Sequence, residues 1–436
     1  MGTVFSNVNV WTPHCESTAP VDVRVEGGQI AAITSPGSAA SPGDDVLDCA
    51  GMLALPGLIN AHTHVAMALL RGCADDVPLH TWLEEHVWPI ERMLTPDDVY
   101  WGSVLGLVEM VRAGTTQIVD MYFHVDAVGR AVRDVGLRAN LSYGIVADSM
   151  DDVGRRELET AEGVVATWHG ACGGRIRAAV APHAVYSCGE DVLQAAAKLA
   201  GRYTVPIHTH LSEAEKEVDD WSNVHGVSPV ATLERIGVLE VPTLAAHCVH
   251  VSEDDIERLA AHGVSVLHCP CSNAKLGNGV APIAAMQRAG VNVALGTDGA
   301  ASNNNLDLFR EMRTAALLQK AIRRDANILS ADAVLEMATE NGARALGLAT
   351  GTLAVGAPAD VVVVDLECAH VQPIYDAQSA LVYASHSDDV VDVMIDGAFV
   401  VREGNLMTVD EDEVRSEVKV RAGRLRDGMA HPGTAA

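Results

Sequence analysis

The stretch that decides the fold is Pro56-Gly57-Leu58-Ile59-Asn60-Ala61-His62-Thr63-His64, an apolar run that ends in two histidines separated by one residue. Its length and composition are those of a buried β-strand. Residues i and i+2 of a strand point to the same side, so His62 and His64 present two imidazoles to one place. Ordinary core histidines also produce this spacing, so the meaning of the pair depends on what other strands bring to it.

Short apolar runs recur through the middle of the chain, and each is followed by a helix-like stretch. They give eight candidate strands, at 53–62, 115–123, 138–146, 176–184, 205–211, 243–250, 264–272 and 292–299. Eight strands alternating with helices are the pattern of a closed (β/α)8 barrel of the TIM type, whose active site lies at the C-terminal ends of the strands. The residues at those ends are His62, His64, Asp120, Tyr143, His183, His210, Glu213, His247, Asn273 and Asp298. Packing alone does not explain so many polar ends, so we predict an α/β fold with a functional site there.

The two ends of the chain are predicted to form a second, smaller domain. Residues 1–50 and 351–408 both contain short alternating runs with turn signals, for example at 21–25 and 360–365. Neither set is large enough for a stable sheet, so we expect the two to pair in one small β-sandwich. The predicted boundaries are 1–52 plus 351–410 for the sandwich, 53–350 for the barrel and 411–436 for a C-terminal helix and tail.

Two further strand ends turn the histidine pair into a candidate metal site. His210 and Asp298 both follow apolar runs, so a barrel would let four nitrogen and oxygen donors converge: His62, His64, His210 and Asp298. Three imidazoles and a carboxylate suit Zn²⁺ or a similar first-row ion such as Fe²⁺ and leave room for water. We therefore predict one divalent metal ion per subunit, most favourably zinc.

Two residues beside the predicted ligands are candidates for proton chemistry. Glu213 follows His210 by three residues, where a carboxyl group could exchange protons with a substrate, although acids also favour a helix N-terminus. Ser212 and Glu215 fit a capping box, so Glu215 reads as structural. His247 ends the sixth run, where it could orient water or stabilise charge. His208 lies one layer deeper on the same strand face as His210, and we interpret it as barrel interior.

Composition limits the partners and the compartment. The chain has 436 residues with 30 Lys+Arg against 58 Asp+Glu, a formal net charge of −28, which disfavours nucleic acid as a partner. No apolar run reaches the roughly 18 residues that a membrane span needs. Nine scattered cysteines and no export signal favour reduced thiols and a cytoplasmic enzyme. The pair Cys269 and Cys271 lacks a second thiol pair, which argues against a zinc–thiolate site.

With these residues placed, the chain resembles the amidohydrolase superfamily, and within it the 5′-methylthioadenosine/S-adenosylhomocysteine deaminases. The resemblance covers nearly the whole chain. It is carried by 56–64, by Asp120-Met121-Tyr122-Phe123-His124, by Ala245-Ala246-His247-Cys248-Val249-His250, by Lys275-Leu276-Gly277-Asn278-Gly279, by 296–304 and by Gly351-Thr352-Leu353. It implies a metal-dependent hydrolase barrel. It also implies a single metal, since the fourth strand ends in His183 without the lysine that bridges two metals in binuclear members.

The resemblance also implies substrate contacts. Glu91 matches the acid that binds ribose hydroxyls, His183 a further substrate contact, and Trp82 an apolar wall. Arg155 matches one of two arginines that hold an amino-acid carboxylate, but Tyr143 stands in place of the other. Tyrosine cannot supply the missing charge. We therefore expect 5′-methylthioadenosine, 5′-deoxyadenosine or adenosine to be better substrates than S-adenosylhomocysteine.

The predicted reaction is hydrolytic deamination of the adenine ring to the inosine form plus ammonia, by a metal-activated water. Glu213 would protonate the ring and bind it, Asp298 would accept the water's proton as well as bind metal and substrate, and His247 would steady the oxygen. One alternative is the same site acting on guanine, a pterin, cytosine or a triazine. Another is a non-catalytic scaffold, which the intact ligand set disfavours. Family resemblance suggests a homo-oligomer, a dimer or tetramer.

Overall fold

The computed structural model describes residues 2–16 and 19–430, which divide by their contacts into two compact units. The barrel unit consists of 61–107, 118–306 and the described residues from 410 onward. The sheet unit consists of the described residues up to 60, 108–117 and 307–409. The predicted boundary at 350 therefore differs from the division by contacts, which groups the segment from 307 to 350 with the sheet.

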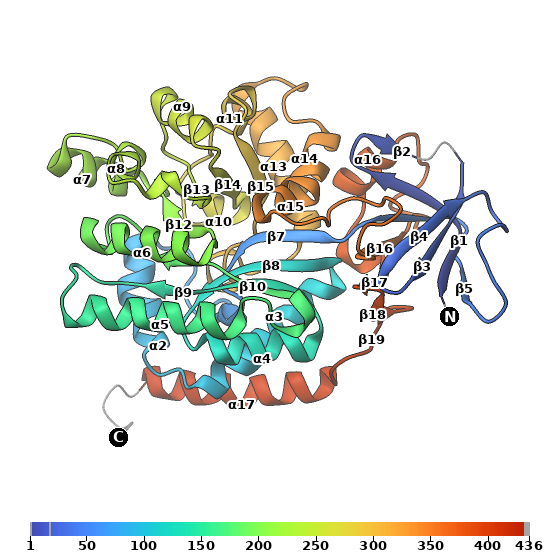
Figure 1. Ribbon diagram of the computed structural model, residues 1–436, viewed down its shortest axis with the longest axis horizontal. Helices are drawn as coiled ribbons and strands as arrows, with labels where there is room; N and C mark the ends of the chain where they lie inside the picture. The colour runs from blue at the N-terminus through green and yellow to red at the C-terminus, as the bar shows by residue number, and fades with distance from the viewer. Residues whose placement is uncertain (1, 17–18, 431–436) are drawn as a thin grey trace. The chain divides into compact units, whose positions relative to one another are not determined.

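The parallel strands of the barrel follow one another in chain order (Figure 1). The first sheet contains β7 (Leu58–Thr63), β8 (Thr115–Tyr122), β9 (Arg138–Ile145), β10 (Ile176–Ala178) and β11 (Ala181–Pro182). The second contains β12 (Ile207–Leu211), β13 (Thr243–His247), β14 (Ser265–His268) and β15 (Asn292–Leu295). Each of these strands from β8 to β15 falls within one of the predicted runs. The first predicted run, 53–62, corresponds to two strands, β6 (Met52–Pro56) and β7, which together extend from 52 to 63.

Backbone contacts join these two sheets into a closed ring. A parallel bridge between Val180 and Ile207 connects the first sheet to the second. At the other edge, the amide of Asp298 donates to the carbonyl of His62 at 3.0 Å. Gly296 permits this approach, since a Cβ there would lie 2.8 Å from the backbone nitrogen of His62. The predicted (β/α)8 barrel is confirmed.

Helices alternate with these strands and cover them. After β8, β9 and β11 come α4 (Val125–Val135), α5 (Asp152–Trp168) and α6 (Glu190–Tyr203), which lie outside the strands in Figure 1. After β12 come α7 (Glu215–His225) and α8 (Pro229–Arg235), after β13 comes α9 (Glu253–Ala261), and after β14 come α10 (Pro270–Lys275) and α11 (Ile283–Arg288). Short helices at α1 (Leu79–Thr81), η2 (Trp82–Val87) and α2 (Trp88–Glu91) precede α3 (Pro96–Arg112).

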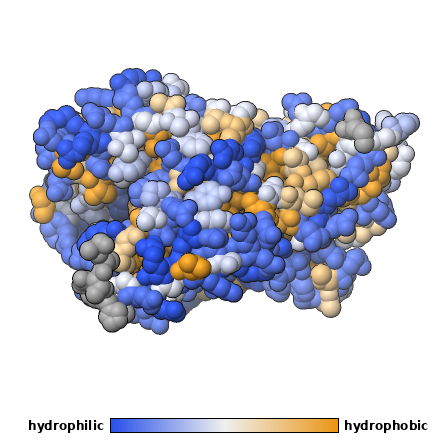
Figure 2. All heavy atoms as spheres, turned by 90° about the horizontal axis from the view of Figure 1, so that it is seen from below, coloured by the Kyte–Doolittle hydropathy of each residue, from blue (hydrophilic) through white to orange (hydrophobic). Residues whose placement is uncertain are grey.

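The predicted C-terminal helix is α17 (Glu411–Ala430), and the predicted tail after it lies outside the described residues. Arg421 and Arg424 pair with Asp97 and Asp98 at the start of α3, and the Arg421 guanidinium lies over the ring of Trp101. Figure 2 looks onto the face that carries α17 and shows it to be mainly hydrophilic. In the described part of the chain, no helix combines the length and the apolar character needed to cross a membrane.

The sheet unit joins both ends of the chain, as predicted. Its ten-stranded sheet has the order β19-β18-β17-β16-β6-β1-β3-β4, with β2 and β5 also on β1. The N-terminal strands are β1 (Thr3–Thr12), β2 (Cys15–Glu16), β3 (Val21–Glu26), β4 (Gln29–Thr34), β5 (Asp45–Asp48) and β6 (Met52–Pro56). The C-terminal strands are β16 (Val361–Asp365), β17 (Val390–Ile395), β18 (Ala398–Arg402) and β19 (Asn405–Leu406). Phe5, Ile30, Val363 and Met394 share one core, so residues from both ends are buried together.

Three longer helices also belong to the sheet unit by their contacts. They are α13 (Leu308–Arg323), α14 (Ala331–Ala338) and α15 (Glu340–Leu346). Alternation of strands and helices does not reveal on which body such helices pack, and this is why the predicted boundary fell later in the chain.

Candidate active site

The four predicted metal donors meet at the C-terminal ends of three barrel strands. His62 is the last residue but one of β7, His64 follows this strand directly, His210 lies in β12, and Asp298 follows β15. The Asp298 Oδ1 is 3.7 Å from Nε2 of His62 and 3.4 Å from Nε2 of His64. The Nε2 atoms of His64 and His210 are 3.3 Å apart. We call these four residues the pocket cluster.

Each histidine of the pocket cluster has its other ring nitrogen held by a neighbouring group. The partners are the Met121 carbonyl for His64 (2.5 Å), the His183 carbonyl for His210 (2.9 Å) and Nε2 of His208 for His62 (2.8 Å). Contacts of this kind fix the ring orientation and the tautomer of a metal-binding histidine. His208 therefore lies in the barrel interior, as predicted, and positions His62.

The donors fit a metal ion. Nε2 of His62 is buried and has no hydrogen-bond partner, although it faces the other three donors. Burial, together with the neighbouring histidines, holds the pKa of His62 and of His210 well below the ordinary value. Both imidazoles are therefore neutral, which is the form that binds a metal. A divalent cation would satisfy the unpartnered nitrogen and the carboxylate together.

Asp298 is held in place with unusual backbone geometry. Its φ of 61° lies in the left-handed region, which costs free energy for any residue other than glycine. Its Oδ2 accepts from the hydroxyls of Ser272 at 2.6 Å and Ser302 at 2.7 Å, and its Oδ1 accepts from the Gly299 amide at 2.7 Å. Burial would raise the pKa of Asp298, but the nearby His64 and the hydroxyl donors outweigh it and lower that pKa. Asp298 therefore stays a carboxylate.

Glu213 and His247 lie beside the pocket cluster. Nε2 of His247 is 3.7 Å from Oε2 of Glu213, and both side chains are buried. The amide of Asn278 donates to Oε1 of Glu213 at 2.9 Å, and Nδ1 of His247 bonds to Oδ1 of Asn273 at 2.9 Å. Burial, and then the charge of Asp298, raise the pKa of Glu213 to about 8. This carboxyl group therefore carries a proton near neutral pH, as a general acid must.

A second buried acid lies further along the same cavity. Glu91, at the end of α2, accepts a hydrogen bond from the Tyr122 hydroxyl at 2.8 Å. Burial raises its pKa to about 7. His183 also lines the cavity, with Nδ1 3.0 Å from the Ser187 hydroxyl, and burial lowers its pKa to about 4. Glu91 thus changes charge near pH 7, whereas His183 stays neutral.

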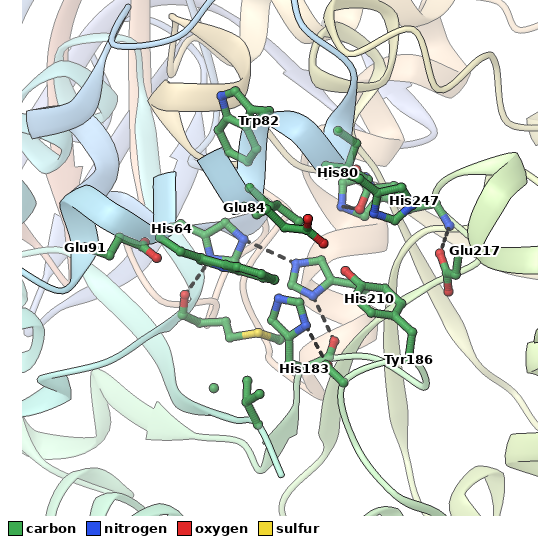
Figure 3. A pocket seen from close by; sticks show the side chains of 18 of the residues that line it. His64, His80, Trp82, Glu84, Glu91, His183, Tyr186, His210, Glu217 and His247 are labelled. Carbon is green, nitrogen blue, oxygen red and sulfur yellow. Dashed lines mark hydrogen bonds and ion pairs between the residues drawn. The ribbon is translucent and has the colours of Figure 1, made fainter. Parts of the chain in front are cut away.

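Apart from His62, the pocket cluster faces one cavity of about 1140 Å³, together with Glu213, His247, Glu91 and His183. Figure 3 shows His64, His183 and His210 gathered together, with Glu91 to one side and Tyr186 to the other. Its lining is largely apolar, with Trp82, Trp88, Phe123 and Trp221 among the aromatic side chains. His62 does not line the cavity but lies completely buried behind the other donors.

Two predicted substrate contacts are not brought to this cavity. The Tyr143 hydroxyl donates to Oε1 of Glu157 at 3.2 Å, and Arg155 is exposed, paired with Asp152 and the Met150 carbonyl. Neither Tyr143 nor Arg155 lines the cavity, whereas Gly144 and Val146, beside Tyr143, do. Alternation along a strand explains why the neighbours of Tyr143 face the cavity when its own side chain does not.

Several site residues were missed by sequence reasoning. Tyr186, Phe123 and Trp221 line the cavity, and Asn278 holds Glu213. Asn278 lies in the motif at 275–279, so the sequence marked this residue but did not indicate its function. Trp221 lies on α7, whose sequence pattern is that of an ordinary surface helix, so nothing in the local sequence marked Trp221 as a site residue.

A (β/α)8 barrel with three histidines and an aspartate at its strand ends, beside a protonated carboxyl group, defines a metal-dependent hydrolase. The chain belongs to the amidohydrolase family, whose model matches residues 53–400.

Relatives and solved structures agree with this assignment. The chain is 48% identical to the 5-methylthioadenosine/S-adenosylhomocysteine deaminase of Moorella thermoacetica, over 87% of this chain and 88% of the relative. It is 44% identical to the 5'-deoxyadenosine deaminase of Methanothermobacter thermautotrophicus, over 92% of this chain and 94% of the relative. A zinc-bound adenosine deaminase from Xanthomonas campestris superposes with a TM-score of 0.93 at 35% identity, over 98% of each chain. The predictions of the family and of a metal-dependent hydrolase acting on C–N bonds are confirmed.

Proposed function

We propose that this enzyme deaminates the adenine ring of adenosine-type nucleosides hydrolytically, giving the inosine form and ammonia. The observation that carries the proposal is Glu213, a buried carboxyl group that keeps its proton at neutral pH and lies beside His247 and Asp298. The relatives named above support an adenine nucleoside over guanine, a pterin, cytosine or a triazine.

The metal of the proposal is a single Zn²⁺ per subunit, held by His62, His64, His210 and Asp298. When bound, such an ion makes water acidic enough to supply a nucleophile near neutral pH. The zinc in the Xanthomonas campestris structure supports this choice, and Fe²⁺ would suit the same donors.

Glu213 is the proton donor of the proposed reaction. Its proton goes to N1 of the adenine ring, and the C6=N1 bond loses its aromatic resistance to addition of water. The Asn278 amide holds one carboxyl oxygen and leaves the other directed toward His247. The raised pKa of Glu213 is suited to this role, since a carboxyl group with an ordinary pKa would have lost its proton at pH 7.

Asp298 and His247 act on the attacking water. Asp298 is a carboxylate whose Oδ1 faces the histidine donors, so it can accept the water's proton and pass it to the departing amine. With Nδ1 of His247 committed to the Oδ1 of Asn273, Nε2 faces the reacting centre. That atom accepts a hydrogen bond from the attacking water and then from the hydroxyl group that forms at C6, and so steadies this oxygen. As ammonia leaves, the remaining hydroxyl proton returns to Glu213.

Glu91 is the proposed ribose contact. Its carboxylate can accept from both hydroxyls of a vicinal diol, and the Tyr122 hydroxyl fixes one of its oxygens. His183 and Trp82 complete the proposed substrate contacts, as a neutral imidazole and an apolar wall. The position of Arg155 and Tyr143 outside the cavity favours an uncharged 5′ group, as in 5′-methylthioadenosine or 5′-deoxyadenosine.

Three coarser expectations accompany this proposal. The acidic net charge favours a small-molecule substrate over nucleic acid, and we expect a cytoplasmic enzyme that forms a homo-oligomer.

The direct test is an ammonia-release screen with the zinc-loaded protein. Adenosine, 5′-methylthioadenosine and 5′-deoxyadenosine should be turned over with higher kcat/KM than S-adenosylhomocysteine. Guanine, cytosine and free adenine, which carry no ribose for Glu91, should be poor substrates. A higher kcat/KM for guanine or cytosine than for every nucleoside would contradict the proposal.

A further inference from the structure

A second group of potential metal donors lies in the sheet unit, built from the end of β16 and the start of β17. The two strands are antiparallel, with Val364 opposite Val390. Asp365, the last residue of β16, and Asp389, the residue before β17, therefore lie at the same end of the sheet. Asp365 is held there as part of β16, where it pairs with Met52 of β6, and Asp389 ends the short helix η6 (Ser387–Asp389) directly before β17.

The turn after β16 carries a thiol and an imidazole to the same place. The carbonyl of Cys368 accepts from the amides of Val371 and Gln372 at 2.9 and 3.1 Å. Leu366 and Val371 are buried, so they anchor the turn on both sides of Cys368. His370 lies within this turn and is partly exposed, with 41% of its side chain accessible.

The donor atoms converge. Nε2 of His370 is 2.9 Å from Oδ2 of Asp389, and Sγ of Cys368 is 3.9 Å from Oδ2 of Asp365. One donor atom from each of Cys368, His370 and Asp389 lies within 4.8 Å of the others. Donors bound to zinc at about 2.0–2.3 Å are themselves roughly 3–4 Å apart in a tetrahedron. We call Cys368, His370 and Asp389 the sheet-end cluster.

The charges at this place favour a cation. Asp389 is buried, and its partners are His370 and the backbone amide of His386, at 2.9 and 2.8 Å. Oδ1 of Asp365 accepts from the Glu367 amide, which leaves Oδ2 facing the thiol. In the described structure, the hydrogen bonds and ion pairs of these two carboxylates include no lysine and no arginine.

We infer that the sheet-end cluster is a second metal site, which binds a zinc-like divalent ion through Cys368, His370 and Asp389, with Asp365 as the fourth donor. A thiolate with an imidazole selects Zn²⁺ over Mg²⁺ or Ca²⁺, which prefer oxygen donors alone. Four protein donors close the coordination shell, so the site is structural and ties the turn to the end of the sheet. It has no part in the proposed deamination.

Cobalt substitution tests this inference, because the pocket cluster contains no sulfur. The full-length protein is stripped with a chelator and titrated with Co²⁺ while the near-ultraviolet absorption is recorded. A thiolate-to-cobalt charge-transfer band should appear by the time two equivalents of Co²⁺ have been added, whichever of the two sites fills first. Cys368→Ser should abolish this band, whereas Cys172→Ser, at a partly exposed cysteine remote in sequence from both clusters, should retain it.

Metal content provides the second measurement. Zinc-saturated wild type, freed of excess metal, should hold two ions per chain, and Cys368→Ser and His370→Gln should each hold one. Their deaminase rates should match the wild type, which also checks that they fold. A cobalt spectrum that is the same for wild type and Cys368→Ser, or one zinc per chain in all of them, would overturn the inference and leave a His370–Asp389 hydrogen bond without a metal.

Discussion

The pocket cluster and the sheet-end cluster use similar residue types for different ends. In the pocket cluster every histidine has its second ring nitrogen held by a carbonyl group or by His208. In the sheet-end cluster His370 is partly exposed, and its ring stacks on that of His386 at 4.6 Å between centroids. The first cluster opens into a large cavity, whereas the second lies at the end of a sheet.

The difference shows what the proposed catalytic metal site has beyond its ligands. Asp298 and His247 both have left-handed backbones, with φ of 61° and 73°, a strain that surrounding structure must hold. Glu213 has a pKa raised to about 8, and Asp298 a lowered one, so an acid and a base coexist in one buried site. None of the three donors of the sheet-end cluster has a left-handed backbone. The proposed deamination requires one protonated and one ionised carboxyl group side by side, whereas binding a structural metal ion does not.

The largest expected effect is loss of the pocket metal. His62→Ala removes a completely buried donor, so turnover of adenosine should fall to the background rate, and one metal ion per chain should be lost. Elemental analysis and an ammonia assay measure both. Chelator-treated wild type should recover activity when zinc is returned, whereas the variant should not. Normal turnover in His62→Ala would separate activity from the pocket cluster.

Removing the proposed proton donor, Glu213, should lower turnover nearly as much. Glu213→Gln keeps the shape and the contact to Asn278 but cannot donate a carboxyl proton. We expect kcat to fall about 10²–10⁴-fold while the metal content stays unchanged. Glu215→Gln, at an exposed position two residues away, is the matched control and should behave as wild type. Equal kcat values for the two variants would refute the role of Glu213.

A change behind the ligands should have an intermediate effect and sharpen the comparison of the two clusters. His208→Leu removes the group that fixes the His62 ring, so metal affinity or activity should drop about 10–100-fold. Competition with a chromogenic chelator measures the affinity. His386→Leu, behind the sheet-end cluster, should leave the affinity of the pocket metal unchanged. An unchanged affinity in His208→Leu would mean that His62 needs no positioning partner.

An effect of similar size on kcat/KM concerns pH and the ribose. Burial raises the pKa of Glu91 to about 7, and only its carboxylate can accept from both ribose hydroxyls. The value of kcat/KM for adenosine should therefore rise as the pH increases through about 7. Glu91→Gln should remove this rise and lower kcat/KM about 10–100-fold at pH 8, equivalent to a charge-assisted hydrogen bond of about 1.5–3 kcal/mol.

Two controls accompany the pH measurement. Glu84→Gln, at an exposed residue that also lines the cavity, should keep the rise through pH 7. For wild type acting on 2′,3′-dideoxyadenosine, which lacks the diol, the rise should be absent. If Glu91→Gln retained the rise with adenosine, the titrating group would be another residue.

The barrel was predictable because its strands are short, apolar and regularly spaced, and because three of its strand ends carry side chains that can bind a metal. The exact points at which the strands end could not be predicted. The sixth strand stops at His247 rather than at 250, since His247 and Cys248 both adopt positive φ angles. The fourth run splits into β10 and β11. Such irregularities arise from contacts between strands, which hydrophobic periodicity does not contain.

The residues of the site also fall into those that the sequence could predict and those that it could not. His62, His64, His210 and Asp298 could be predicted because strand direction places them together. Glu91 reaches the cavity through a helix that ends far from the ligands in sequence, so only the family resemblance indicated it. Arg155 has the right charge but pairs with Asp152 at the surface, and Tyr143 turns toward Glu157. Sequence position does not reveal which polar partner a long side chain selects.

The most direct test of the central claim follows oxygen from water into the base. The zinc-loaded enzyme is incubated with adenosine in ¹⁸O-labelled water, and the products are weighed by mass spectrometry. We predict inosine with one ¹⁸O in its base and one equivalent of ammonia, with production falling about 10²–10⁴-fold in Glu213→Gln. Free adenine with labelled ribose, or unchanged adenosine with fully loaded metal, would contradict the account.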